Sequence, residues 1–488
     1  MNNSSNEIFG LFNVKTFKTL GVDLMTVFLK KINAEKLFET FKPWLIIFCC
    51  GLFYCYQFLL RVLPNTFSQE FFQGYDISAS QFGVIIAAYS SGYVICQLPF
   101  GVMFDRISIR YFFPIAPIIC AIGTLSLSYC NSLISASFSR FLMGVGSAFG
   151  FIGAIKVATL ILPQKKVSLA IGTIVLFGTL GAGIGGAPVK YLASFFGWRE
   201  VMRLIGFLGV FLSVAMFYVL SSEIVKSKQI EFSSKKRNIL RDIKSIIDNR
   251  QIITLSLCGM LMYMPITILG VGWGINFIIT FFNTTYKTAA NGVFFMFLGA
   301  GLGGPIIAFI SEMAGNKKNI MFTSSLLSFL LYIFILYGTS NQTPYFIYVS
   351  FFAIGVLYSA KTLSFAMACE IMPKNISALT ASLLNMVVMS TGIIFHPLVG
   401  YLLGYGYSEN PVSYSSFDYK IALSILPLSS LIACYLIYFN LEPKKSSRLF
   451  WRKLLASVNL AIKFCKKVAL GLQQLCKFMK RALESNDV

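Results

Sequence analysis

The sequence predicts an all-α polytopic membrane protein, with twelve transmembrane helices in two pseudo-symmetric six-helix bundles and cytoplasmic N and C termini. Three observations lead to this prediction. Of the 488 residues, 56% are hydrophobic and only 12% are charged, which excludes a soluble enzyme and a disordered chain. Twelve apolar stretches are each long enough to cross a hydrocarbon core of about 30 Å. The basic residues of the short loops gather on one side of the predicted membrane.

The predicted spans form two sets of six, separated by a polar segment. The first set lies near 43–66, 78–103, 111–130, 132–162, 167–196 and 201–221. The second set lies near 251–282, 288–313, 320–339, 344–372, 377–403 and 421–441. We therefore expect five regions: a cytoplasmic N-terminal amphipathic segment (1–42), a first six-helix bundle (43–221), a basic cytoplasmic linker (222–250), a second six-helix bundle (251–442) and a basic amphipathic cytoplasmic tail (443–488).

The loops after even-numbered spans carry most of the loop lysines and arginines, whereas the loop at 67–80 carries only Glu70 and Asp76. Because short cytoplasmic loops are enriched in Lys and Arg, we expect the basic loops, the linker and both termini to lie in the cytoplasm. The basic loop residues are Arg106, Arg110, Lys165, Lys166, Lys317, Lys318 and Lys374.

The net charge is +22, from 41 Lys+Arg against 19 Asp+Glu. Much of the excess lies in the tail, where Lys and Arg alternate with apolar residues at helical intervals between Ser447 and Glu484. This pattern predicts a basic helix on the anionic inner leaflet, where each basic residue contributes about 1 kcal/mol. A helix that binds a soluble partner is the alternative. Because nucleic-acid-binding proteins are not this apolar, no nucleic-acid partner is expected.

Nothing in the sequence indicates a metal or a cofactor. The 11 cysteines are odd in number, fall mostly in apolar runs and include no Cys-x-x-Cys pair. Neither a cluster of metal ligands nor a phosphate-binding Gly-x-x-x-x-Gly-Lys run is present. The expected site therefore has no metal and no cofactor, and the protein is not expected to be an enzyme.

The two predicted bundles repeat a pattern of glycine and proline. Gly144 is followed by Pro163 and Pro188, whose spacing is 25 residues, and Gly355 is followed by Pro373 and Pro397, whose spacing is 24. An internal duplication of six spans around a central cytoplasmic loop is typical of a transporter whose two bundles move around a site at the membrane midplane.

Four motifs together resemble those of the major facilitator superfamily, over essentially all of residues 43–442. The strongest lies between the second and third spans, although Ser108 stands where the family usually has glycine. The third is only partial, since alanine occupies the place of an antiporter-type proline. The motifs are Gly101-x-x-x-Asp105-Arg106-x-x-x-Arg110, Arg140-x-x-x-Gly144-x-Gly146, Gly181-Ala182-x-x-Gly185-Gly186 and Phe196-Gly197-Trp198-Arg199.

The resemblance implies a monomeric transporter in which spans one, four, seven and ten line a cavity while three, six, nine and twelve face lipid. In the first motif, Gly101 permits close helix approach. Asp105, Arg106 and Arg110 form a charge network expected to hold the cytoplasmic side closed and to break on opening.

Ionisable residues inside apolar spans are the main candidates for function, because each costs about 2.5–3.5 kcal/mol to insert. Arg61, Arg140 and Lys361 are the deepest cations, and no carboxylate lies at a similar depth. Lys156 and Lys190 lie nearer the span ends, and helical rotation places Glu370 on the opposite face from Lys361.

Polar residues at helical spacing extend this set, because polar stripes within spans indicate a water-filled cavity. For the tyrosines an interfacial belt is the alternative, and for Asn385 a helix–helix hydrogen bond. The predicted substrate-binding residues are Tyr54, Gln57, Arg61, Tyr89, Tyr93, Arg140, Trp273, Asn276, Tyr358, Lys361 and Asn385.

Three deep cations without a carboxylate partner predict a small organic anion, carboxylated or phosphorylated, as the transported solute. Glu370, Asp76 and His396 are the candidates for proton coupling, but neither carboxylate is deep, and histidine in such a place is more often packed. The scarcity of carboxylates favours exchange with a counter-anion, or facilitated flow, over coupling to a proton.

Other functions stay open at this point. They are a carrier for a dipeptide, siderophore or drug-like solute, a non-transporting sensor or scaffold, and a membrane enzyme, which would need an interfacial His or carboxylate cluster. Short loops favour a bacterial inner membrane, while glycosylation-type triplets at 283–285 and 341–343 keep a eukaryotic membrane in view.

Overall fold

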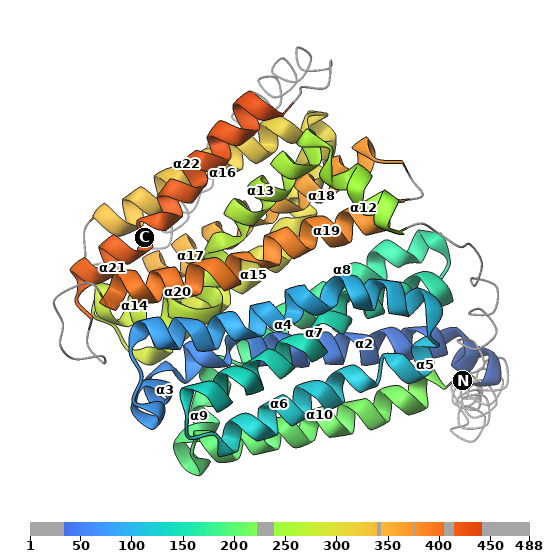
Figure 1. Ribbon diagram of the computed structural model, residues 1–488, viewed down its shortest axis with the longest axis horizontal. Coiled ribbons are helices and arrows are strands. Elements are labelled where there is room, and N and C mark those ends of the chain that lie inside the picture. The colour runs from blue at the N-terminus through green and yellow to red at the C-terminus, as the bar shows by residue number, and fades with distance from the viewer. Residues whose placement is uncertain (1–33, 222–238, 339–342, 374–375, 405–413, 442–488) are drawn as a thin grey trace, which may run out of the picture.

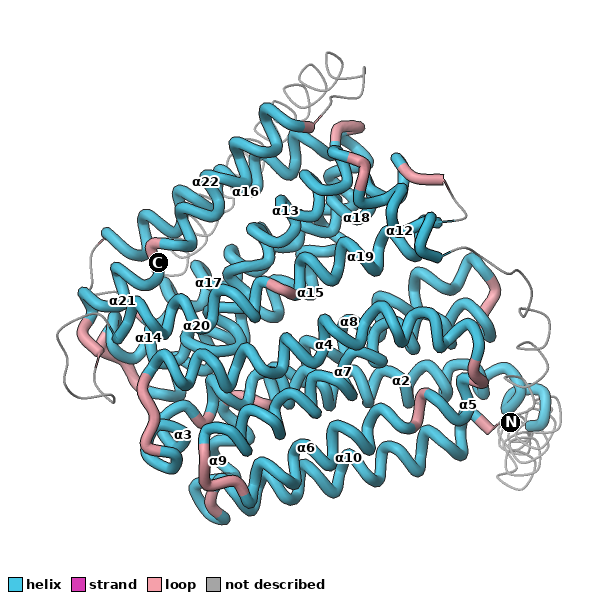
Figure 2. Tube along the Cα trace, viewed as in Figure 1, coloured by secondary structure: helices cyan, strands magenta, loops and turns pink. Residues whose placement is uncertain are grey.

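The computed structural model describes residues 34–221, 239–338, 343–373, 376–404 and 414–441, and every element within those ranges is helical (Figures 1 and 2). The first helix set comprises α2 (Ala34–Thr66), α3 (Ser68–Tyr75), α4 (Ala79–Arg106), α5 (Ile109–Phe112), α6 (Ile115–Tyr129), α7 (Leu133–Ile161), α8 (Gln164–Ile184), α9 (Ala187–Phe196) and α10 (Trp198–Leu220). These elements follow the predicted spans, except that α2 begins at Ala34, inside the segment expected to precede the first span.

The second helix set follows the linker. It comprises α12 (Ile239–Ile247), α13 (Arg250–Pro265), the π-helix η2 (Ile266–Trp273), α14 (Gly274–Phe282), α15 (Tyr286–Ala314), α16 (Lys317–Tyr337), α17 (Pro344–Tyr358), the 3₁₀ turn η3 (Ser359–Lys361), α18 (Thr362–Ile371), α19 (Ser377–Met389), α20 (Thr391–Gly404), α21 (Ser416–Leu423) and α22 (Ile425–Asn440). The tail 443–488, most of the segment 1–42 and most of the linker lie outside the described residues.

Within the described ranges, eleven helices are long and apolar enough to cross a membrane. A twelfth span results if the bent pair Leu169–Ile184 and Ala187–Phe196 is counted as one, with a bend of 41°. The bend lies at Gly185 and Gly186, and Pro188 follows in the first turn of α9. A glycine pair next to a proline is a common cause of a helix kink. The predicted fifth span is therefore a broken helix.

Capping side chains start several helices where the apolar runs begin. Ser78 and Gln81 form a reciprocal capping box at α4, and Ser415 and Asp418 form another at α21. The Asn249 side chain accepts from the first backbone N–H groups of α13. Such caps satisfy backbone donors that a helix leaves unpaired.

The glycines of the repeat lie at equivalent helix crossings. A Cβ added to Gly144 of α7 would lie 1.9 Å from the Tyr89 carbonyl oxygen of α4, and one added to Gly355 of α17 would lie 2.0 Å from the Met296 carbonyl oxygen of α15. Only glycine permits such backbone contact. The shared role agrees with duplication, although the pseudo-symmetry itself and the bundle boundaries stay predictions.

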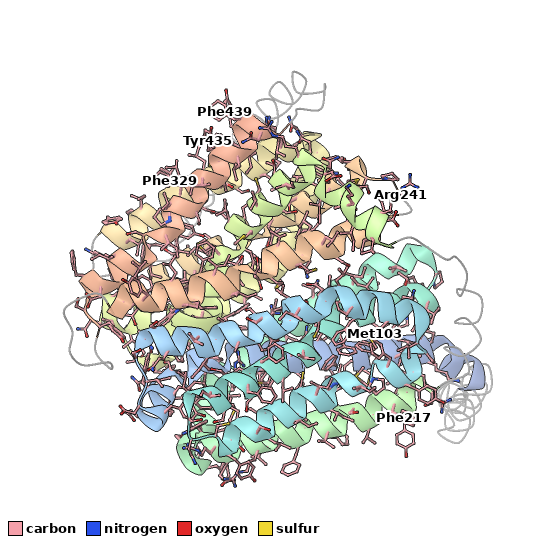
Figure 3. The ribbon with its side chains drawn as sticks, in the orientation of Figure 1. Met103, Phe217, Arg241, Phe329, Tyr435 and Phe439 are labelled. Atoms are coloured by element: carbon pink, nitrogen blue, oxygen red, sulfur yellow. The ribbon has the colours of Figure 1, made fainter. Side chains whose placement is uncertain are left out.

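Apolar side chains cover the outer surface, as lipid contact requires. Phe211 on α10 is 68% exposed and Phe439 on α22 is 67% exposed. Figure 3 shows Phe217, Tyr435 and Phe439 pointing away from the helix bundle. These helices correspond to predicted spans six and twelve, which the family resemblance places against lipid.

The two helix sets lie side by side and meet through α4 against α19 and α20, α8 against α15, and α2 against η2 (Figure 1). We call the end that carries α3, α9 and α14 the α3 end, and the opposite end, with α5 and α12, the α12 end. At the α3 end α4 and α20 approach closely, since a Cβ on Gly83 would lie 2.4 Å from the His396 carbonyl oxygen. The candidate site lies where these helices meet.

Candidate functional site

A small cavity lies between the two helix sets, where α2, α4, α13, η2, α19 and α20 converge. Its volume is about 10 Å³, which is room for roughly one water molecule. It is lined by Arg61, Tyr89, Ser90, Tyr93, Tyr263, Thr267, Val271, Met389 and His396. Three of the predicted residues, Arg61, Tyr89 and Tyr93, are therefore brought together in one cavity.

Arg61 of α2 reaches across to the second helix set. Its Nη1 donates a hydrogen bond to the Tyr263 hydroxyl at 3.1 Å. The guanidinium carbon also lies 5.5 Å from the Tyr93 ring centroid and 5.6 Å from that of Tyr89. Both distances are within the range of cation–π attraction. Among the described residues, the hydrogen-bond acceptor of Arg61 is a tyrosine hydroxyl, which carries no charge.

Arg140 of α7 is completely buried behind Tyr89. Its Nη1 donates to the Leu60 carbonyl oxygen at 2.8 Å, and its guanidinium lies 4.7 Å from the Tyr89 ring. In the part of the chain that the structure describes, Nε and Nη2 of Arg140 have no hydrogen-bond partner. Tyr89 therefore lies between two guanidinium groups, and the second has unused donors.

Lys361 supplies the third cation from the other helix set. It ends the η3 turn, a 3₁₀ interruption between α17 and α18, and is 9% exposed. Its Nζ lies 4.0 Å from the Tyr263 ring and 4.7 Å from the Tyr358 ring, whose centroids are 5.8 Å apart. Tyr263 thus contacts Arg61 through its hydroxyl and Lys361 through its ring.

Together these contacts form one continuous group across the two helix sets. We call it the cation–tyrosine cluster, and it consists of Arg61, Arg140, Lys361, Tyr89, Tyr93, Tyr263 and Tyr358. Asn385 of α19 lies beside the Tyr93 hydroxyl. Gln57 accepts a long hydrogen bond from the Tyr89 hydroxyl through its backbone oxygen, at 3.5 Å, while Tyr54 packs against Phe58 with ring centroids 5.0 Å apart.

Trp273 and Asn276 lie nearer the α3 end and do not line the cavity. Trp273 is fully buried, with its ring centroid 5.2 Å from that of Phe82. The Asn276 Oδ1 accepts a hydrogen bond from the Ser68 hydroxyl at 3.0 Å. Their position follows from η2, because a π-helix changes the direction of side chains relative to a regular α-helix.

Asn65 of α2 makes three hydrogen bonds to the second helix set. Its Nδ2 donates to the carbonyl oxygens of Leu269 and Gly270 at 2.9 and 3.0 Å, and its Oδ1 accepts from the backbone N–H of Ile275 at 3.0 Å. We call these three bonds the Asn65 clamp. They occupy backbone groups of η2 and of the first turn of α14, at the α3 end of the cavity.

Sequence patterns did not identify four residues of the site, which are Tyr263, Ser90, Thr267 and Asn65. For His396 they favoured a packing role. One available signal was the i, i+4 spacing of Tyr263 and Thr267, which places both on one face of the seventh span. The polar stripe was instead counted from Trp273, the last residue of the π-helical segment. No sequence signal identifies Asn65, because its partners are backbone atoms.

Three carboxylates of the described helices lie at helix ends and have partners there. Glu70 pairs with Lys190, and Glu370 pairs with Lys317 rather than with Lys361, as helical rotation predicted. Asp418 accepts from the Ser415 backbone and hydroxyl. Consequently, none of the residues that line the cavity is acidic.

The predicted gating motif is described in part. Residues 101–106 form the C-terminal end of α4, but the side chains of Asp105 and Arg106 lie outside the described atoms. Arg110 in α5 packs over the rings of Tyr111 and Phe217, at 5.1 and 5.6 Å. Its role in gating, and that of Gly101, stay predictions.

Comparisons with known proteins agree with this architecture. A family model described as Major Facilitator Superfamily matches residues 44–395 and 255–470. Uncharacterized transporter YybO of Bacillus subtilis is 22% identical over 372 residues, which cover 70% of this chain and 83% of the relative. Probable galactarate/D-glucarate transporter GudP of Escherichia coli is 24% identical over 369 residues, covering 66% and 78% respectively.

Among solved structures, a bacterial homolog of the human lysosomal transporter Spinster, inward-facing and unoccupied, superposes with a TM-score of 0.65. The match covers 84% of this chain and 98% of that one, at 16% sequence identity. Similarity at this level concerns the fold.

Proposed function

Because this chain belongs to the Major Facilitator Superfamily and is a multi-pass membrane transporter, we propose that it carries a small organic anion by alternating access. The observation that carries the proposal is the cation–tyrosine cluster. It holds three buried cations near the contact between the two helix sets, and the described residues of the cavity that Arg61 lines include no carboxylate.

The buried cations of the cluster need a compensating negative charge. An ion removed from water loses several kcal/mol of hydration, and buried charges are therefore normally paired. Among the described residues, Arg61 and Arg140 donate hydrogen bonds to uncharged oxygens and to a thioether, and Lys361 lies against two tyrosine rings. A carboxylate or phosphate would supply the missing negative charge, and the arginine fork suits either group.

The relatives give independent support for an anionic solute. Galactarate and glucarate, in the name of the E. coli relative, are dicarboxylates at neutral pH. The specific solute does not transfer at 24% identity. We infer only that carboxylated or phosphorylated metabolites come before dipeptides, siderophores and drug-like solutes.

The cavity volume supports a cycle with a change of conformation. About 10 Å³ is too small for an organic anion, so the helix sets must separate on at least one side to admit it. The Asn65 clamp and the Ser68–Asn276 bond hold the sets together at the α3 end.

We propose that this end faces outward from a bacterial inner membrane, that the chain acts as a monomer, and that its termini lie at the anionic inner leaflet.

The charged residues also bear on whether transport of the anion is coupled to a proton. A proton symporter normally has a buried carboxylate that changes charge during the cycle. Since Glu370 pairs with Lys317 at a helix end, and the described residues that line the cavity include no carboxylate, we propose exchange with a counter-anion, or facilitated flow, rather than proton symport.

Uptake of a labelled anion panel into proteoliposomes, with and without a pH gradient, tests this function. Wild-type protein is expected to take up at least one carboxylate or phosphate ester, and the Arg61→Ala variant is expected to lose this uptake. Arg203→Ala is the matched control, because Arg203 pairs with Glu200 on α10, away from the cavity. Normal anion uptake by Arg61→Ala, or transport of neutral solutes alone, would contradict the proposal.

A further inference from the structure

His396 is the one histidine of the chain, and its environment is unusual for a packed residue. It lies on α20, lines the cavity beside Arg61 and is 0% exposed. Among the described residues, neither Nδ1 nor Nε2 has a hydrogen-bond partner. A histidine buried only for structural reasons usually has at least one paired nitrogen, because an unpaired buried polar group is costly.

The ring is held by packing. A Cβ on Gly272 of η2 would lie 2.9 Å from the His396 Cε1 and 3.0 Å from its Nδ1, so glycine leaves the space that the imidazole occupies. Gly83 of α4 lies against the His396 backbone, since a Cβ there would lie 2.4 Å from the His396 carbonyl oxygen. Three elements therefore position an imidazole that makes no hydrogen bond to the described chain.

We infer that His396 contacts the transported solute and recognises a hydrogen-bond donor beside its acid group; this inference rests on the anionic solute proposed above. A neutral imidazole has one N–H donor and one unprotonated acceptor nitrogen. A carboxylate or phosphate accepts hydrogen bonds only, so it can satisfy the N–H but not the acceptor nitrogen. A hydroxyl next to the acid supplies the missing donor.

The groups around His396 define what the solute must bring. The cations of the cluster provide donors for the acid group, whereas the acceptor nitrogen of His396, unpaired among the described residues, is left for a donor of the solute. The site is therefore suited to hydroxylated anions, and His396 acts as a specificity-determining residue.

The test measures binding of two matched pairs to purified full-length protein by calorimetry at pH 7.5. Malate and succinate differ by one hydroxyl next to a carboxylate, and glycerol 3-phosphate and propyl phosphate differ by hydroxyls near a phosphate. For at least one pair, wild-type protein is expected to bind the hydroxylated member about tenfold more tightly, since sites built for a hydroxyl reject its absence.

Three variants separate recognition from packing. His396→Phe is expected to bring the affinity ratio within about twofold of unity. His396→Gln, which keeps a donor and an acceptor, is expected to retain most of the preference. Gly272→Ala displaces the ring without changing its chemistry and is expected to lower the ratio; it also keeps the test decisive if His396→Phe fails to fold.

Each outcome has a defined meaning. A ratio that is unchanged in His396→Phe, or a wild type that binds both members of every pair equally, overturns this inference and leaves the anion carrier intact. A wild type that binds none of the four anions, but binds neutral solutes, overturns the proposed function and this inference with it.

Discussion

Replacement of Asn65 by alanine is expected to open the α3 end. The clamp joins α2 to η2 and α14 through three hydrogen bonds of 2.9, 3.0 and 3.0 Å, and Asn65 is 1% exposed. Each such bond contributes about 1 kcal/mol of net stabilising free energy. The substitution therefore destabilises the conformation that contains the clamp by roughly 3 kcal/mol. Since 1.4 kcal/mol corresponds to a factor of ten, the population open at this end rises up to about 150-fold.

Hydrogen–deuterium exchange with mass spectrometry measures this change directly, because amide exchange reports the population of open states. Peptides covering 66–78 and 274–285 are the reporters, and peptides from α10 are the internal reference. Asn65→Ala should exchange 10- to 150-fold faster in the reporters and equally in the reference. Asn65→Asp turns a buried carboxylate toward the Leu269 and Gly270 carbonyl oxygens, so its reporter peptides should exchange at least as fast as those of Asn65→Ala.

Ser68→Ala is the matched control, because it removes the single bond to Asn276, 3.0 Å long, at the same end. A loss of about 1 kcal/mol corresponds to roughly fivefold faster exchange. Reporter exchange within twofold of wild type in a folded Asn65→Ala protein would refute the reasoning. The reasoning would also be refuted if Ser68→Ala accelerated exchange in the reporter peptides as much as Asn65→Ala does.

Three further predictions concern the cluster, the helix crossings and an ion pair. Tyr263→Phe removes the hydroxyl that orients Arg61, and anion uptake should show an apparent KM about tenfold higher at similar Vmax. Gly144→Ala places a methyl group 1.9 Å from a backbone oxygen and should lower the Tm sharply, whereas Gly304→Ala, with open space around it, should leave the Tm unchanged or slightly raised. Glu70→Gln breaks a partly exposed ion pair and should change stability by less than about 1 kcal/mol, as judged by thermal unfolding in detergent.

Much of the fold could be predicted because hydropathy is a property of local sequence. Span-length apolar runs correspond to the observed helices, with the exception of the kink between α8 and α9. The depth of Arg61, Arg140 and Lys361 also follows from position along a span, and all three are buried. The orientation of the termini and the pseudo-symmetry of the bundles stay predictions.

The remaining features depend on how helices from the two sets approach each other. The π-helical turn at 266–273 interrupts the regular spacing of the seventh span, so counting from Trp273 does not reach Tyr263. The Asn65 clamp binds backbone oxygens, which every residue has, and therefore leaves no pattern in the sequence.

The sequence by itself determined that this protein is built from membrane-spanning helices and that three cations lie deep in spans without a carboxylate at similar depth. Both conclusions follow from the cost of placing polar and charged groups in an apolar medium, which depends on residue type and depth alone. Only the tertiary structure decided that Tyr263 joins Arg61 to Lys361, that Asn65 connects the two helix sets and that His396 has no hydrogen-bond partner among the described residues. Those features depend on distances between residues far apart along the chain, such as Arg61 and Tyr263, which only helix packing sets.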